Sequence, residues 1–118
     1  MKQAPLDIIM PVYNEGENIL DALNALKRDV RTPFGVYIIY DFEEDNTLPA
    51  VKKAEYIGFE IHFIKNRSRG AHEAIMTGFD STKGEAAVVF PADESYNSVI
   101  LDKMFDKFKA GNELVIAS

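Results

Sequence analysis

The sequence contains no cysteine. This absence excludes disulfides, cysteine nucleophiles and thiolate-bound zinc, and it favours a reducing compartment such as the cytoplasm. The longest apolar runs have the length of a β-strand, well short of the roughly 20 residues that cross a bilayer, so we expect no transmembrane segment. Residues 1–5 also lack the apolar stretch of a signal peptide. Together these absences predict a cytoplasmic protein.

Positive charge is also scarce. The chain has 13 basic against 19 acidic side chains, which gives a formal net charge of -6. Such a chain repels the phosphates of nucleic acids unless a local basic patch intervenes. Only Lys65, Arg67 and Arg69 come close to forming one. We therefore expect no nucleic-acid partner.

Glycine-rich phosphate-binding motifs are missing as well. Neither GxGxxG nor GxxxxGK[ST] occurs in the sequence, which argues against a Rossmann dehydrogenase and a P-loop NTPase. The GxSxG turn of α/β hydrolases is absent too. Phosphate recognition by this chain would therefore have to use a metal ion.

The sequence does contain short β-rich apolar runs that alternate with segments of helical period. We expect strands at residues 6–10, 36–40, 60–64, 86–90 and 114–117, and helices at 15–28, 47–57, 71–82 and 98–109. This alternation predicts an α/β fold, a three-layer α/β/α sandwich around a mostly parallel sheet with the strand order third, second, first, fourth. With 118 residues, 47% of them hydrophobic, the chain is predicted to form a single domain over residues 1–118.

Acidic side chains follow three of the predicted strands, in residues 11–15, 41–45 and 91–95. Ligands bind at the carboxyl ends of the strands in such sheets, and clustered carboxylates repel one another unless a cation neutralises them. Mg²⁺ is commonly shared between carboxylates and substrate phosphates. The pattern is therefore consistent with a metal-assisted diphosphate site.

Each of these loops also has a simpler interpretation. Asp, Asn and Glu at strand ends often cap the next helix or form turns, and Asn14 is expected to cap the first helix. Tyr13 could stack on a nucleobase or pack against that helix as a hydrophobic staple. Arg67 and Arg69, which precede a predicted helix, could bind an anionic ligand or remain solvated cations.

Several segments carry a likeness to a known family. The stretch "IIMPVYNEGENI" resembles the opening strand and loop of family 2 glycosyltransferases, and "IIYDFEEDNT" resembles their second-strand motif. The stretch "RGAHEAIMTGFDSTKGEAAVVFPADES" is similar to the segment that ends in their Asp-Ala-Asp motif. With the following "YNSVILDKMFDKFKAGNELVIAS", it looks most like dolichyl or polyprenyl phosphate mannosyltransferases. The likeness spans nearly the whole chain and corresponds to the N-terminal, nucleotide-binding part of the family.

The resemblance implies a Rossmann-like GT-A fold that binds a nucleotide-diphosphate sugar, a GDP- or UDP-hexose, with Mg²⁺ or Mn²⁺. The reaction it implies transfers the hexose to a lipid phosphate, such as polyprenyl phosphate, or to a saccharide acceptor, in the cytoplasm at the inner membrane face. It identifies no catalytic residue. By position, the implied binding residues are Pro11, Tyr13 and Glu15 for base and ribose, Ile39 and Asp41 as walls of the base pocket, Arg69, Pro91 and Ala92 beside the donor, and Asp93 with Ser95 as metal ligands.

Two positions depart from the family's motifs. Its Asp-Asp pair is Tyr40-Asp41 here, and its Asp-Ala-Asp motif is Pro91-Ala92-Asp93. Loss of one charged hydrogen bond is predicted to weaken donor binding by about 1 to 3 kcal/mol. Because relatives in the family continue well beyond this length, the chain is expected to be truncated, and its activity alone stays open. The alternative is a non-catalytic nucleotide-binding or regulatory module; a nucleotidyltransferase is disfavoured because its Gly-rich, basic first loop is absent.

Overall fold

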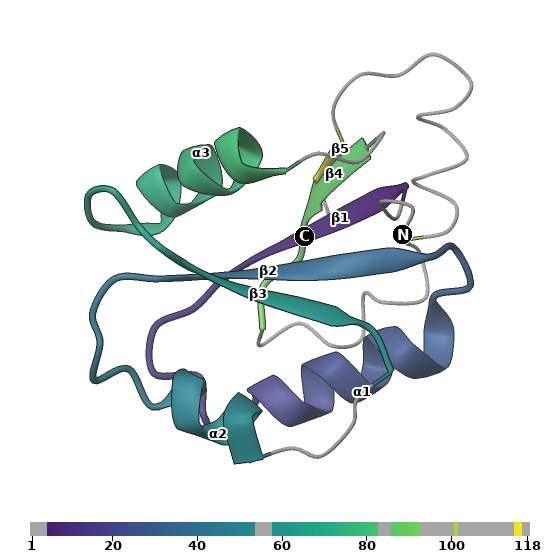
Figure 1. Ribbon diagram of the computed structural model, residues 1–118, viewed down its shortest axis with the longest axis horizontal. Helices are drawn as coiled ribbons and strands as arrows, with labels where there is room; N and C mark the ends of the chain where they lie inside the picture. Colours follow the sequence, from purple (N-terminus) through teal and green to yellow (C-terminus); the bar gives the residue numbers. More distant parts are fainter. Residues whose placement is uncertain (1–4, 54–57, 83–85, 93–100, 102–114, 117–118) are drawn as a thin grey trace.

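A parallel β-sheet forms the centre of the molecule (Figure 1). The computed structural model describes residues 5–53, 58–82, 86–92, 101 and 115–116. Among these, the strands lie in the order β3-β2-β1-β4-β5, and every neighbouring pair is parallel. The strands are β1 (Leu6–Pro11), β2 (Phe34–Tyr40), β3 (Glu60–Lys65), β4 (Ala86–Val89) and β5 (Val115–Ile116).

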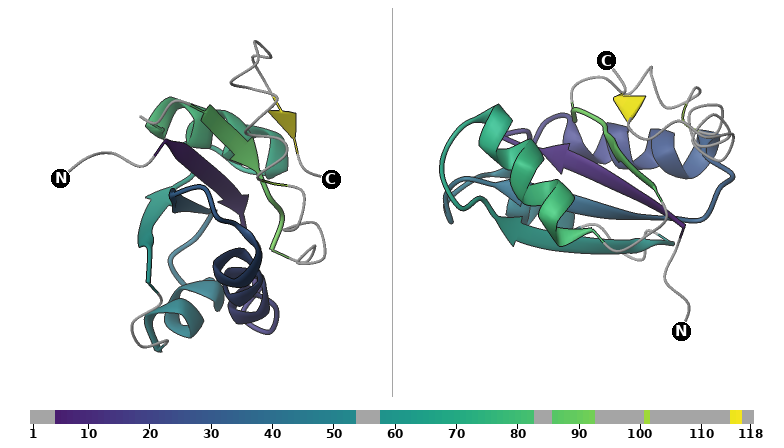
Figure 2. Two further views of the ribbon diagram at one scale, coloured as in Figure 1. Left: turned by 90° about the vertical axis from the view of Figure 1, so that its right-hand side faces the viewer. Right: turned by 90° about the horizontal axis from the view of Figure 1, so that it is seen from above.

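Helices cover both faces of this sheet. Figures 1 and 2 show α1 (Ile19–Asp29) and α2 (Thr47–Lys53) on one face and α3 (Ala71–Ser81) on the other. The predicted three-layer architecture and strand order are confirmed. No helix within the described ranges has both the length and the apolar character needed to cross a membrane.

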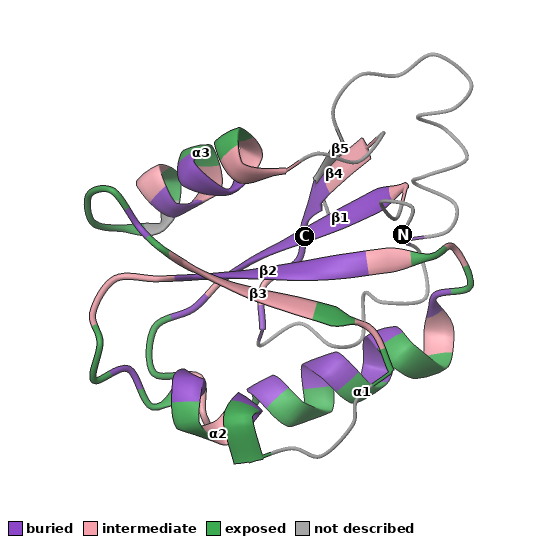
Figure 3. Cartoon of the chain, in the orientation of Figure 1, coloured by how far each residue is buried: buried purple, intermediate pink, exposed green. Residues whose placement is uncertain are grey.

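Strand alternation divides the core into two apolar clusters. In β1, Ile8 and Met10 pack with α1, whereas Ile9 belongs to a second cluster beneath α3 that includes Ile39 and Val89. Successive side chains of a strand point to opposite faces, which produces this division. Figure 3 shows the buried stripe of α1 turned toward the sheet, as its apolar spacing predicts. The same alternation decides which residues lie on each side of the sheet at the carboxyl ends of the strands.

The helix α3 lies unusually close to the central strand β1. Gly78 faces Ile9, and a Cβ atom placed on Gly78 would lie 2.4 Å from the Ile9 Cγ2 atom. Real Cβ atoms do not approach another carbon so closely. The absence of a side chain at Gly78 is therefore what allows α3 to take this position.

The main departures from the expected elements are at helix α1 and near the end of the chain. The first helix begins at Ile19 rather than at residue 15, and Asn18, not Asn14, holds its N-cap position, without a side-chain capping bond. Asn14 has a positive φ of 50° and lies in the loop after β1, before the helix begins. The helix expected at 98–109 lies outside the described residues, apart from Leu101.

Candidate functional site

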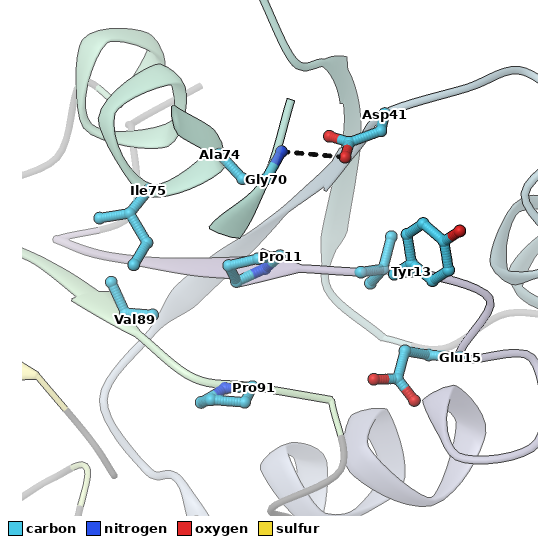
Figure 4. A pocket seen from close by; sticks show the side chains of 10 residues that line it. Pro11, Tyr13, Glu15, Asp41, Gly70, Ala74, Ile75, Val89 and Pro91 are labelled. Carbon is cyan, nitrogen blue, oxygen red and sulfur yellow. Dashed lines mark hydrogen bonds between the residues drawn. The ribbon is translucent and has the colours of Figure 1, made fainter. Parts of the chain in front are cut away.

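A cavity of about 310 Å³ opens at the carboxyl ends of β1 and β4, beside the start of α3 (Figure 4). It lies on the α3 side of the sheet because the alternating rows of side chains continue past the strands. Pro11 and Tyr13 extend the row of Ile9, and Pro91 extends the row of Val89. The described lining residues are Pro11, Val12, Tyr13, Glu15, Asp41, Gly70, Ala74, Ile75, Val89 and Pro91.

A second cavity of about 380 Å³ adjoins the first and shares Tyr13 and Asp41 with it. Phe42 and Arg69 complete its described lining. The Tyr13 side chain is 68% exposed, so it does not pack as a staple on α1, and its ring meets Phe42 edge to face at a centroid distance of 5.6 Å. Tyr13 therefore presents an aromatic surface to both cavities.

Phe42 is a lining residue that the sequence reasoning missed. Its only signal in the sequence is an aromatic side chain directly after Asp41, in a loop otherwise rich in acidic residues. Its contact with Tyr13 joins the loop after β2 to the loop after β1. An edge-to-face aromatic pair of this kind is worth about 0.5 to 1.5 kcal/mol beyond the area that it buries.

Asp41 stands at the boundary between the two cavities. Its Oδ1 atom accepts a hydrogen bond from Asn66 Nδ2 at 2.8 Å. Its Oδ2 atom accepts one from the Gly70 backbone N–H at 3.2 Å, the dashed line in Figure 4. Each carboxylate oxygen can accept a further bond. The carboxylate is therefore fixed by the protein and still able to accept a hydrogen bond from a ligand.

The two arginines before α3 have different surroundings. Arg67 is held on α3, because its Nη2 atom lies 2.7 Å from Asp80 Oδ2 and its Nε–H donates to Thr77 Oγ1 at 3.3 Å. Arg69 is exposed and lines the second cavity. Of the two cations considered from the sequence, the structure thus brings Arg69 to the cavities and ties Arg67 to the helix.

The loops after β1 and β2 are joined by a set of hydrogen bonds, which we call the loop clasp. The fully buried Asp45 carboxylate accepts from the backbone N–H groups of Asn14 and Thr47, at 3.1 and 2.8 Å. Three more bonds complete the clasp: Glu15 N–H to Thr47 Oγ1, Gly16 N–H to Asn46 Oδ1, and Asn46 N–H to Asn14 Oδ1. The clasp explains why α1 starts late and why Asn14 does not cap it.

The loop clasp also positions two residues of the predicted site. Tyr13 directly precedes the clasped segment, and Glu15 lies within it. In Figure 4 the Glu15 carboxylate points into the space between Tyr13 and Pro91. One of its oxygens also accepts a bond from Asn18 Nδ2 at 3.0 Å. The loop after β2 therefore fixes how the loop after β1 faces the cavity.

Some residues of the predicted site lie elsewhere. Ile39 is fully buried in the cluster beneath α3, and Ala92 is buried in the cluster on the α1 side. Neither is among the described lining of the two cavities. The predicted metal ligands Asp93 and Ser95 lie outside the described residues. Within the described part of the chain, no group of three or more His, Cys, Asp or Glu side chains could hold a metal ion.

The two departures from the family's motifs lie on different faces of the sheet. Tyr40 packs against the cluster on the α1 side and does not line either cavity. Pro91 does line the first cavity. Of the two departures, Pro91 is therefore the one found in the described lining of a cavity.

Comparison with known sequences identifies relatives of this chain. A family model described as Glycosyl transferase family 2 matches residues 7–118. A Bacillus subtilis (strain 168) protein named as a glycosyltransferase, CsbB, is 31% identical over 99% of the chain and 37% of its own length. An undecaprenyl-phosphate 4-deoxy-4-formamido-L-arabinose transferase from Serratia proteamaculans (strain 568) is 30% identical over 75% of the chain and 28% of its own length. The chain thus spans about a third of the length of these relatives.

Comparison with solved structures supports the fold. The S. aureus protein TarS (residues 1–349), solved with UDP-GlcNAc, matches with a TM-score of 0.68 and 21% identity, over 89% of this chain and 31% of that one. The mannosyltransferase PcManGT from Pyrobaculum calidifontis, solved with GDP-Man and Mn²⁺, matches with a TM-score of 0.64 and 22% identity, over 79% and 28%. At these identities the matches establish the arrangement of helices and strands.

Proposed function

Because this chain belongs to glycosyl transferase family 2 and has the family's GT-A fold, we propose that its two adjoining cavities bind the nucleotide of a nucleotide-diphosphate sugar. The single observation that carries the proposal is the meeting of Tyr13, Asp41 and Arg69 around one cavity. These side chains supply an aromatic surface, a hydrogen-bond acceptor and a cation. A nucleotide needs all three.

The base is proposed to lie against Tyr13 and Phe42, because the flat face of a nucleobase stacks well on aromatic rings. Asp41 accepts a hydrogen bond from a ring N–H, which both uracil and guanine possess. Arg69 interacts with the negative charge of the diphosphate through its guanidinium group. These roles account for either a UDP- or a GDP-hexose, in line with the UDP-GlcNAc and GDP-Man present in the two structural neighbours.

A divalent cation, Mg²⁺ or Mn²⁺, is proposed as a partner of the diphosphate. The described residues do not form a metal site by themselves, since Asp41 and Glu15 are the two carboxylates in the described lining of the cavities and no third such ligand joins them. The metal proposal therefore rests on Asp93 and Ser95 in the sequence, together with the Mn²⁺ in the Pyrobaculum structure. Such oxygen ligands suit both cations.

For the whole protein we propose transfer of a hexose from this donor to a lipid phosphate or saccharide acceptor. A polyprenyl phosphate acceptor is supported by the Serratia relative, whose name specifies undecaprenyl phosphate. The same proposal places the reaction in the cytoplasm, at the inner membrane face. The relatives are named as transferases, which favours an enzyme over a non-catalytic nucleotide-binding module.

Calorimetric titration of the 118-residue chain with UDP, GDP and ADP, each with Mn²⁺ and with a chelator, tests the proposal. We expect UDP or GDP to bind in preference to ADP. Asp41→Asn should weaken that binding by about 10-fold, the effect of losing one hydrogen bond to a charged group. Asp21→Asn, on the exposed side of α1, is the charge-matched control and should bind like the wild type. Equal affinity for all three diphosphates, unchanged by Asp41→Asn, would contradict the proposed function.

A further inference from the structure

A buried asparagine connects Asp41 to helix α3. Asn66 follows β3, is only 5% exposed, and donates through Nδ2 to Asp41 Oδ1 at 2.8 Å. We propose that Asn66 is a positioning residue for nucleotide binding, which holds the Asp41 carboxylate and the first turn of α3 in the arrangement that receives the base. The inference rests on the proposed function, because it takes Asp41 to be a ligand-binding group.

The Asn66 amide is fixed in one orientation by four partners. Its Nδ2 atom donates to Asp41 Oδ1 and to the Gly70 carbonyl oxygen, the latter at 3.3 Å. Its Oδ1 atom accepts from Thr77 Oγ1 at 3.0 Å and from the Ser68 backbone N–H at 3.3 Å. A side-chain amide has two N–H donors and two acceptor positions, and all four are used. A flipped amide would turn its oxygen toward two other oxygens, so only this orientation fits.

The hydrogen bonds around Asn66 run in one direction, toward Asp41. The Arg67 guanidinium donates through Nε–H to Thr77 Oγ1, the Thr77 hydroxyl donates to Asn66 Oδ1, and Asn66 Nδ2 donates to the Asp41 carboxylate. Successive donors in such a chain polarise one another. Arg67, which is also paired with Asp80, therefore acts at the far end of this network, and the carboxylate lies at its near end.

The same network fixes the start of α3 against the cavity. Gly70 has a φ of 91°, in the region that favours glycine, and both of its backbone polar groups take part. Its N–H donates to Asp41 and its carbonyl accepts from Asn66. Gly70 and Ala74 line the first cavity. Asn66 thus sets the carboxylate and one wall of the cavity together.

Asn66→Asp tests the inference because it keeps the shape of the side chain and replaces the donating NH₂ group by an oxygen. Two carboxylates at this contact repel, which raises the pKa of the pair above the ordinary range for aspartate. At pH 8 we expect uridine or guanosine to bind roughly 10- to 100-fold more weakly than to the wild type. As the pH falls toward 5, a proton shared between the two carboxylates restores a donor, and affinity should recover in part.

Nucleosides are used as ligands because they carry no phosphate. The second ionisation of a phosphate, near pH 6, would otherwise change the charge of the ligand within the pH range of the measurement. Among the described residues, the other charged side chains that line the two cavities are Glu15 and Arg69, and Lys65 and Glu43 lie 3.8 Å apart as a neighbouring ion pair. All four are also present in the wild type. The pH dependence of nucleoside affinity in the wild type, measured by saturation-transfer NMR between pH 5 and 8, therefore serves as the reference for their effects.

Two further variants complete the design. Asn24→Asp adds the same charge on the exposed side of α1 and should leave affinity and pH profile unchanged. Thr77→Val keeps the shape of its side chain but removes the hydroxyl that donates to Asn66. It should weaken nucleoside binding by about 3- to 10-fold without adding pH dependence. If circular dichroism shows that Asn66→Asp does not fold, Thr77→Val decides: weaker binding supports the inference, and unchanged binding overturns it.

The outcomes separate the inference from the proposed function. Wild-type affinity in Asn66→Asp at pH 8 overturns the positioning role and leaves the function of Asp41 intact. A loss of equal size at pH 5 and pH 8 also overturns it, because a merely structural defect would not respond to a shared proton. If the wild-type chain binds neither nucleosides nor their diphosphates, the proposed function itself fails, and the role of Asn66 in binding fails with it.

Discussion

Replacement of Gly78 by alanine tests how the cavity wall is held against the sheet. The added Cβ would lie 2.4 Å from Ile9 Cγ2, 3.1 Å from Cγ1 and 3.2 Å from Cδ1. Ile9 is fully buried in the central strand, and all three of its side-chain carbons beyond Cβ are close to the new atom. The contact therefore requires either the buried Ile9 side chain or helix α3 to shift.

Two opposing terms decide the result of Gly78→Ala. Alanine favours the helical backbone over glycine by about 1 kcal/mol. Adding a methyl group to a filled core typically costs about 1 to 3 kcal/mol, and the 2.4 Å contact puts this site toward the upper end of that range. We expect a net loss of about 1 to 2 kcal/mol in the free energy of unfolding.

Urea denaturation followed by circular dichroism measures this loss, with Gly35→Ala as the matched control. Gly35 is buried in β2, but the nearest atom to an added Cβ, the Glu60 carbonyl oxygen, is 3.9 Å away, so this variant should be near neutral. Ile9→Ala alone should cost about 2 to 5 kcal/mol. Combined with Gly78→Ala, it should cost at least 1 kcal/mol less than the sum, because the two changes compensate. Wild-type stability of Gly78→Ala, or strict additivity, would refute the steric argument.

Two further predictions concern the loops around the cavities. Asp45→Ala removes the acceptor of two hydrogen bonds in the loop clasp and should lower the free energy of unfolding by about 2 to 4 kcal/mol. Asp45→Asn should cost about half as much. Equal urea midpoints for the wild type and both variants would contradict this prediction. Arg69→Ala should weaken UDP or GDP binding about 5- to 10-fold and reduce its salt dependence, whereas Lys53→Ala, an exposed cation on α2, should do neither. Calorimetry at two salt concentrations measures both effects, and identical behaviour of the two variants would exclude a role for Arg69.

The sheet could be predicted from the sequence because its determinants are local. Apolar runs such as residues 6–10 and 36–40 fix the strands, and the helical segments between them require parallel neighbours with right-handed crossovers. The order β3-β2-β1-β4 agrees with these rules together with one reversal in the direction of winding, which leaves a crevice at the carboxyl ends of the strands. The meeting of Tyr13, Asp41 and Pro91 at one edge follows as well, since parallel strands end on the same side.

The details of the site could not be predicted because they depend on contacts between distant parts of the chain. Asn14 looks like a helix cap in the sequence, but its bonds reach a loop 31 and 32 residues away. Asn66 directly follows Lys65, which pairs with Tyr40, so the register between β2 and β3 brings it beside Asp41, 25 residues earlier. Arg67 and Arg69 cannot be told apart until Asp80 and Thr77 are seen to hold the first.

The departures at residues 40 and 91 illustrate how strand geometry changes the meaning of a motif. Adjacent residues of a strand face opposite sides, so Tyr40 can pack in the α1-side cluster while Asp41 reaches the cavities. A carboxylate at position 40 of this chain would meet apolar side chains, and tyrosine suits that position better. Pro91, two positions after Val89, lines the cavity and makes its wall apolar. Along the sequence, both positions lack the family's carboxylate; in the folded chain, Pro91 is in the described lining of the first cavity, whereas Tyr40 is in the described lining of neither cavity.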